Sequence, residues 1–295
     1  MDEVFRSGEL IWYNTARMIR KILVLFDLLA VPRAAFRHRS LLWQMTKRNI
    51  ETRYRGSVLG LVWSFIQPLM MLVVYTFVFS VVFKARWGVE IAGGESKGAF
   101  AVIMFCGMAM YNLFSEAVNM SCGCITGNVN LVKKVIFPLE ILPLVQTLTT
   151  FVLGMAWFIL LFFGTWLILG NLNWTMLLLP VVLAPLMVFT LGVAYLVASL
   201  GVFIRDTSYV VGVILQILFF ATPIFYPINA VPEQFRVWLE MNPLTVFIDQ
   251  ARNVFLYGRL PDWQFLGIAA LVALAVLQFG SFFFTRTKRG FADVL

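Results

Sequence analysis

Long stretches without a single charged residue constrain this chain more than any other feature of its sequence. A transmembrane helix needs about 20 predominantly apolar residues, and the longest stretch has room for two such helices. The stretches are also too long, and alternate too weakly, for transmembrane β-strands. The sequence therefore predicts six transmembrane helices. The charge-free stretches cover residues 57–83, 98–115, 141–204, 207–232 and 263–285.

The overall composition excludes an ordinary soluble domain. Hydrophobic residues make up 61% of the chain and charged residues 13%, against roughly 45–50% and 25% in soluble proteins. We expect an all-α polytopic membrane protein with a cytoplasmic N-terminal region at 1–57, a six-span domain at 58–285 and a cytoplasmic tail at 286–295.

Basic residues are distributed unevenly between the two expected sides of the membrane. Most of the 23 Lys and Arg residues fall on the side of the N-terminus, chiefly within 1–57. The positive-inside rule therefore predicts that both termini lie in the cytoplasm. This topology also explains the net charge of +8, so the basic residues do not indicate a nucleic-acid partner.

Residues 40–55 predict an amphipathic helix that leads directly into the first span. At 100° per residue one arc of this helix is polar, and Arg53 is the charged residue that falls outside it. Such a helix either anchors the chain at the membrane surface or also contacts a cytoplasmic partner, and the pattern allows both. The polar arc contains Gln44, Lys47, Arg48, Glu51 and Arg55, and the remainder contains Leu41, Leu42, Trp43, Met45 and Ile50.

Polar residues within the expected spans are few. Gln67 precedes Pro68 in the first span, where proline predicts a kink and glutamine prefers to face protein or a cavity. Glu116 falls about one turn from the cytoplasmic end of the second span. We expect Glu116 to reach the membrane surface or to pair with a basic residue.

The sequence lacks the residues that common catalytic centres require. Its one histidine is His38, so neither a Ser-His-Asp triad nor a histidine-based metal site can form. No GxxxxGK[ST] motif is present to bind the phosphates of ATP. We expect no catalytic residue and no metal site, with Cys106, Cys122 and Cys124 serving as packing residues. The energy for any transport must then come from a partner.

Two segments outside the spans have patterns of their own. On the external side, Pro232 and Pro243 suit the first turns of short helices at 232–241 and 243–257, which we expect to re-enter the outer membrane interface. On the cytoplasmic side, residues 127–140 predict a short helix that ends before Pro138. Its two lysines lie between apolar residues, which suits either docking in a partner's groove or anchoring at the inner leaflet.

Three blocks of the sequence carry a family resemblance. They are RNIETRYRGSVLG at 48–60 with WSFIQP at 63–68, NLVKK at 130–134 with FPLEILP at 137–143, and PIFYP at 223–227 with NPL at 242–244. Together they resemble the permeases of ABC polysaccharide exporters over roughly residues 40–285. The segment FKARWG at 83–88 is similar to the branch that exports O-antigen and related lipid-linked glycans.

The resemblance implies a homodimeric permease in the bacterial inner membrane, served by two copies of a cytoplasmic ATPase that binds ATP and Mg²⁺. The ATPase would contact an interface helix at about 40–51 and a connecting helix near 128–137, and two re-entrant helices would form an external gate. The expected coupling residues are Asn130, Leu131, Lys133, Lys134 and Phe137, and the expected gate residues are Pro232, Trp238, Pro243 and Phe247.

The resemblance also implies that a lipid-linked polysaccharide passes along the dimer interface, beside the first and fifth spans. Aromatic rings suit such a path because sugar rings stack on their faces with little directional demand. Two other hypotheses stay open. One is the same permease fold with a capsule, teichoic-acid, lipid or drug cargo; the other is a membrane-embedded transferase, which requires several acids or histidines at one membrane face. The expected channel residues are Trp63, Tyr75, Phe219, Phe220, Phe225 and Tyr226.

Overall fold

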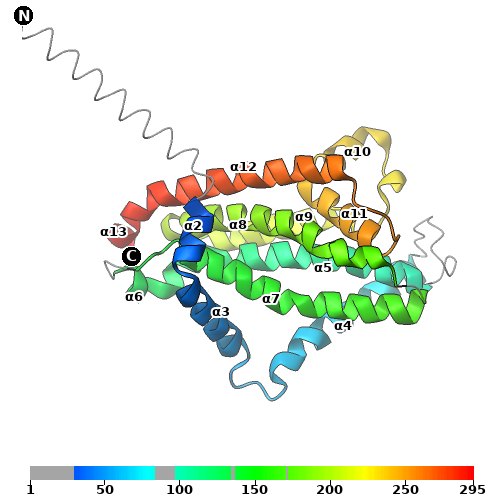
Figure 1. The fold of residues 1–295 in the computed structure, drawn as a ribbon, viewed down its shortest axis with the longest axis horizontal. Coiled ribbons are helices and arrows are strands. Elements are labelled where there is room, and N and C mark those ends of the chain that lie inside the picture. Colours follow the sequence, from blue (N-terminus) through cyan, green and yellow to red (C-terminus); the bar gives the residue numbers. More distant parts are fainter. Residues whose placement is uncertain (1–29, 84–96, 134–136, 171) are drawn as a thin grey trace, which may run out of the picture.

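The chain folds as a bundle of long helices with shorter helices at both ends (Figure 1). The computed structural model describes residues 30–83, 97–133, 137–170 and 172–295. Within these residues the regular secondary structure is helical and includes no β-strand, so the all-α prediction is confirmed. The lengths and apolar compositions of the helices fit a polytopic membrane protein.

Five helical segments in the described part of the chain are long and apolar enough to cross a membrane. The helix α9, Thr207–Phe220, corresponds to the fifth expected span but has 14 residues. At 1.5 Å per residue it covers about 21 Å, short of a hydrocarbon core of about 30 Å. The count of six spans therefore stays a prediction. The five segments are Gly60–Val82 with α4 (Trp63–Thr76), Gly98–Cys122 in α5 (Lys97–Cys122), Ile141–Leu169 with α7 (Ile141–Gly164), Trp174–Phe203 with α8 (Leu179–Phe203), and Trp263–Val294 with α12 (Trp263–Thr287).

The early end of α9 follows from the local sequence. Pro223 disfavours the helical conformation in the residue before it, Thr222, and lacks the N–H group that would continue the helix. The backbone at 221–227 is accordingly irregular. The apolar stretch predicted as a single span is thus divided into a helix and a turn.

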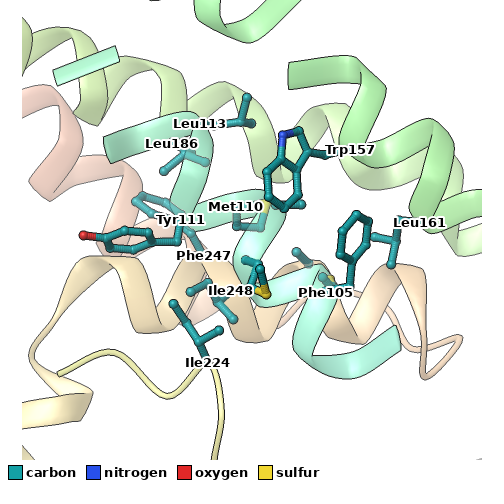
Figure 2. Packing of buried hydrophobic residues seen from close by; sticks show 14 of the residues in the cluster. Phe105, Met110, Tyr111, Leu113, Trp157, Leu161, Leu186, Ile224, Phe247 and Ile248 are labelled. Carbon is teal, nitrogen blue, oxygen red and sulfur yellow. The ribbon is translucent and has the colours of Figure 1, made fainter. Parts of the chain in front are cut away.

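The helix α5 forms the centre of the bundle. Its most apolar window is 83% buried, whereas the corresponding window of α4 is 6% buried. Side chains of α7 and α11 pack against α5, as Figure 2 shows for Phe105, Met110, Trp157 and Phe247. All three cysteines are free and buried, in agreement with a packing role. Most of the apolar surface of α4, in contrast, lies outside the core of the protomer.

The helices α8 and α12 approach each other closely at a pair of glycines. A Cβ atom on Gly192 would lie 2.5 Å from the backbone nitrogen of Leu277, and a Cβ atom on Gly280 would collide with the carbonyl oxygen of Gly192. Small residues let helices pack closely in a membrane, where lipid removes the hydrophobic drive for association. These two glycines therefore permit the close crossing of α8 and α12.

Short helices occupy the two ends of the bundle (Figure 1). The helices α10 and α11 form one end, at the positions predicted for the two external helices, so the existence of both helices is confirmed. The opposite end carries four short helices that precede, connect or follow the long ones. The first end carries α10 (Glu233–Glu240) and α11 (Pro243–Phe255), and the opposite end carries α2 (Ala30–Arg37), α3 (Arg39–Tyr54), α6 (Val129–Val132) and α13 (Phe291–Val294).

Three details at this second end differ from the sequence-based expectations. Trp43 is 65% exposed within the protomer and lies on the same side of α3 as the exposed Lys47, four residues on. The helix expected over 128–137 is a single described turn, α6, and Phe137 is not helical because it precedes Pro138. The segment predicted as the tail is anchored to the bundle by Phe291, which is fully buried in a hydrophobic cluster.

Candidate functional site

Aromatic side chains from α4, α5, α9 and the turn after α9 meet in one cluster. Phe225 lies at its centre, with its ring centroid 4.5 Å from that of Phe79 and 5.3 Å from that of Tyr75. The ring of Phe219 lies 5.0 Å from Phe225 and 5.0 Å from Tyr111 of α5. The cluster contains four of the six predicted channel residues, namely Tyr75, Phe219, Phe220 and Phe225.

The predicted channel residues differ in their exposure within the protomer. Phe225 is 2% exposed and holds its neighbours in place, whereas Phe220 is 54% exposed and free to touch a ligand or a second copy. Tyr226 is half-buried, and its hydroxyl donates a hydrogen bond to the carbonyl oxygen of Phe220 at 2.9 Å. Trp63 is exposed at the start of α4, and no ring contact among the described residues joins it to the cluster.

A buried arginine fixes the turn that carries Phe225. Arg252 of α11 is 3% exposed, and it pairs with Asp249 at 3.3 Å. Burial raises the pKa of the Asp249 carboxyl, while Arg252 acts in the opposite direction. The guanidinium replaces the helical hydrogen bonds that the turn has lost. It donates to the carbonyl oxygens of Pro223 at 2.9 Å, Ile224 at 3.2 Å and Ile103 at 3.4 Å.

The start of α11 contacts the same turn. Asn242 caps α11 by accepting a hydrogen bond from the backbone of Leu244 at 3.0 Å, and its amide donates to the hydroxyl of Thr222 at 3.0 Å. Pro243 occupies the first turn of the helix, as its sequence position predicts. The structure therefore bonds the 242–244 half of the third sequence block to Thr222, the residue that immediately precedes the 223–227 half.

The predicted gate residues fall on two unlike helices. Phe247 of α11 is fully buried and its ring lies 6.2 Å from that of Phe189 on α8. Trp238 of α10 is 73% exposed, and Pro232 immediately precedes that helix. Thus α11 is packed into the bundle, while α10 has no fully buried residue.

The connection between α5 and α7 has an apolar and a polar side. Leu131 and Phe137 pack against the hydrophobic cluster at that end of the bundle, and Asn130 and Lys133 are exposed. The expected coupling residue Lys134 lies outside the described residues. The connection therefore presents polar groups outward from an anchored base.

Two long-range contacts hold the end of this connection. Lys288, just after α12, forms an ion pair with the carboxylate of Glu140. The hydroxyl of Tyr195 on α8 donates to the carbonyl oxygen of Glu140 at 2.9 Å. The C-terminal segment thus holds the side chain of Glu140, and α8 holds its backbone, where the connection joins α7.

An ion pair joins α3 to the centre of the bundle. Arg53 pairs with Glu116 of α5, and the amide of Asn112 donates to the same carboxylate at 3.3 Å. This contact explains why Arg53 falls outside the polar arc of its helix. It also confirms that Glu116 pairs with a basic residue.

Sequence reasoning missed three contributors to the site. Arg252 is the one basic residue in the predicted helix at 243–257. A charged residue in a segment that re-enters the membrane indicates a buried partner, so this position could have been predicted. Phe79 and Tyr111 carried no comparable signal. With 29 Phe and 8 Tyr in the chain, no single ring is distinguished by its type alone.

Comparisons of this sequence with a protein-family model and with known proteins indicate the same family. Residues 40–256 match the family described as ABC-2 type transporter. The O-antigen export system permease protein RfbA of Myxococcus xanthus is 30% identical over 273 residues, which span 90% of this chain and 99% of that protein. A protein of the same name from Klebsiella pneumoniae is 26% identical over 92% of this chain and 96% of its own length. The polysialic acid transport protein KpsM of Escherichia coli is 23% identical over 79% of this chain and 88% of its own. This chain therefore belongs to the ABC-2 type transporter family.

Proposed function

We propose that this chain is the membrane permease subunit of an ABC transporter that exports a lipid-linked polysaccharide of the O-antigen type across the bacterial inner membrane. Two copies of the chain form the transport path. Two copies of a separate cytoplasmic ATPase bind ATP and Mg²⁺ and supply the energy. The permease chain binds and guides its cargo and performs no chemical step.

The observation that carries this proposal is the extent of the similarity to the Myxococcus xanthus permease. The match covers nearly the whole of both chains, so it includes the long helices, the connection after α5 and the two helices at the opposite end. The other relatives are named for O-antigen export or polysialic acid transport. Their names agree with the polysaccharide cargo that the sequence blocks imply.

The burial of α4 supports a path between two copies of the chain. Only 6% of its apolar window is buried, although the neighbouring aromatic cluster includes Tyr75 of α4 and Phe79 from the π-helical turns just after it. The exposed Phe220 lies on α9 beside that cluster. A second copy facing α4 and α9 would enclose an aromatic-lined path, which lets sugar rings stack and still slide.

The grouping of α3 and the connection after α5 supports a common ATPase-binding end. Met45 of α3 and Val132 of α6 belong to one hydrophobic cluster, so the two elements share a packed base. Both lie at the end of the bundle opposite α10 and α11 (Figure 1). The positive-inside rule assigns this end to the cytoplasm, where a soluble ATPase is accessible.

The contrast between α10 and α11 supports an external gate with one fixed and one movable part. The buried contacts of Arg252 tie α11 to α5 and to the turn at 223–224. The apolar side chains of α10, including Trp238, are exposed. We infer that α11 is the frame of the gate and α10 its moving part.

The location of lipid-linked polysaccharide in a strain that lacks this gene tests the proposal. We expect the polymer to accumulate on the cytoplasmic side, and surface polymer to return only when both this chain and its partner ATPase are supplied. Complementation with the permease gene in a strain that lacks the ATPase is the matched control. Unchanged surface polymer in the deletion strain would refute this cargo and favour a lipid, drug or teichoic-acid exporter.

A further inference from the structure

A polar cavity of about 340 Å³ lies between α3, α4, α5, α7 and α9. The first turns of α4, the second half of α5 and the first half of α9 form its walls, so it lies in the half of the bundle nearer α3. The rings of the aromatic cluster do not line it. Its volume falls at the lower end of the range of about 300–1,000 Å³ that is typical of ligand pockets.

One face of α5 supplies most of the polar groups in this cavity. Asn112, Ser115, Glu116 and Asn119 follow the spacing i, i+3, i+4, i+7, which places them on a single side of a helix. All four line the cavity, and Gln67 of α4 lines it as well. A polar face on the most deeply buried long helix requires a polar partner.

That partner is not supplied in full by the protein. The amide of Asn112 donates to Glu116 at 3.3 Å. In the part of the chain that the structure describes, the side chains of Gln67 and Asn119 make no hydrogen bond. Both side chains are exposed where they border the cavity, so their amide groups are open to a polar molecule that enters it. The cavity is therefore built to hold a polar molecule.

The charges of the lining favour a neutral ligand. Arg53 and Glu116 form an ion pair and neutralise each other, so a phosphate group would find the cation occupied and a carboxylate beside it. An acyl chain would leave the amides without partners. A sugar matches both the polar and the aromatic parts of the lining. Its hydroxyl groups can bind the amides, and its C–H face can pack on the ring of Trp157, which also lines the cavity.

We propose that this cavity is a glycan subsite in which the polar face of α5 and Gln67 bind sugar hydroxyl groups before the polymer enters the path between two copies. The inference rests on the proposed function, because the exported polymer is the ligand. The wall formed by α4 is weakly buried within the protomer. The Arg53–Glu116 pair connects the cavity directly to α3, so a displacement of α3 by the ATPase changes the cavity.

Protection of a cysteine placed in the cavity tests the proposal. Ser115 is half-buried in the lining, and Ser115→Cys is introduced after the three buried native cysteines are replaced by alanine. N-ethylmaleimide labelling is then compared in membranes from cells that make the polymer and cells that do not. We expect labelling to be about threefold slower with polymer. This is the slowing expected when the polymer concentration is about twice its dissociation constant from the cavity. Ser40→Cys, at an exposed position of α3, should label equally in both membranes.

Substitutions in the lining give a second readout. Asn112→Leu and Asn119→Leu should abolish the polymer-dependent protection, and Asn119 is exposed, so its replacement does not disturb the core. Gln278→Leu on α12 is the matched control, since it replaces an amide remote from the cavity and should leave protection intact. Equal labelling of Ser115→Cys in both membranes, or protection that survives both leucine variants, would overturn the subsite. If the unmodified chain still exports polymer normally in the polymer-making strain, the proposed function stands.

Discussion

Replacement of Arg252 by methionine isolates the role of the buried guanidinium. Methionine keeps an unbranched side chain of similar reach but removes the charge and every donor. The substitution leaves the carbonyl oxygens of Pro223 and Ile224 without their described donors and frees Asp249 from its ion pair. We therefore expect the turn at 221–227 to separate from α11, and the last turn of α11 to loosen from α5.

The size of the effect follows from the burial of the group. Breaking a buried, hydrogen-bonded charge contact costs about 3–5 kcal/mol when one partner is removed. With about 2–4 °C per kcal/mol for a chain of this size, the melting temperature should fall by ~6–20 °C. Arg252→Lys should recover only part of this loss, because an ammonium group cannot reproduce the planar fork of donors.

Thermal unfolding of the detergent-purified protein measures the global loss, and thiol labelling measures the local one. Cys106 is fully buried and adjoins Gly107, whose Cβ would lie 2.8 Å from the Arg252 guanidinium. Arg252→Met should therefore expose Cys106 to maleimide. Arg236→Met is the matched control, since Arg236 also donates to a backbone carbonyl at 3.1 Å but is only part-buried; a loss of about 1 kcal/mol is expected there. If Arg252→Met has the melting temperature and the Cys106 protection of the wild type, Arg252 does not hold the turn at 221–227 in place.

Three further substitutions test other contacts. Gly192→Val should lower the free energy of unfolding by about 1–3 kcal/mol through overpacking of α8 against α12, whereas Gly267→Val, with no atom within 4 Å of its Cβ, should be neutral by the same thermal assay. Lys288→Glu should destabilise the protein by about 1–3 kcal/mol, and adding Glu140→Lys should restore most of the loss in a double-mutant cycle. Phe220→Ala should reduce polymer export by up to about tenfold, as one aromatic contact contributes about 0.5–1.5 kcal/mol, with the melting temperature unchanged because the ring is exposed.

The long helices were predictable because their signal is local. A charge-free stretch of about 20 residues has few alternatives to a membrane helix, and Pro232 and Pro243 sit at helix starts for a reason that needs no tertiary information. The end of α9 has a local signal in Pro223, but the conformation of the turn that follows it has none. Hydropathy continues past Phe220, and the turn that interrupts it is held by Arg252, a residue far along the chain.

The ion pair between Arg53 and Glu116 shows which kind of information the sequence holds. Each residue was recognisable as out of place, one outside the polar arc of its helix and the other as an acid inside a span. Their pairing depends on the angle between α3 and α5, which neither local pattern contains. A charged residue in an apolar position therefore indicates that it has a partner, but identifying that partner requires the three-dimensional arrangement of the helices.

The polar face of α5 carries this reasoning one step further. Its i, i+3, i+4, i+7 spacing can be recognised in the sequence. A polar stripe on a membrane helix can, however, either bind a ligand or pack against another polar helix. The structure distinguishes these cases, because α4 lies across a cavity from the stripe and is the least buried of the long helices. A helix packed tightly against α5 would satisfy Asn119 permanently and leave nothing for a ligand to bind. The cavity between α4 and α5 instead keeps those groups available, which is the property that a subsite for a sliding polymer requires.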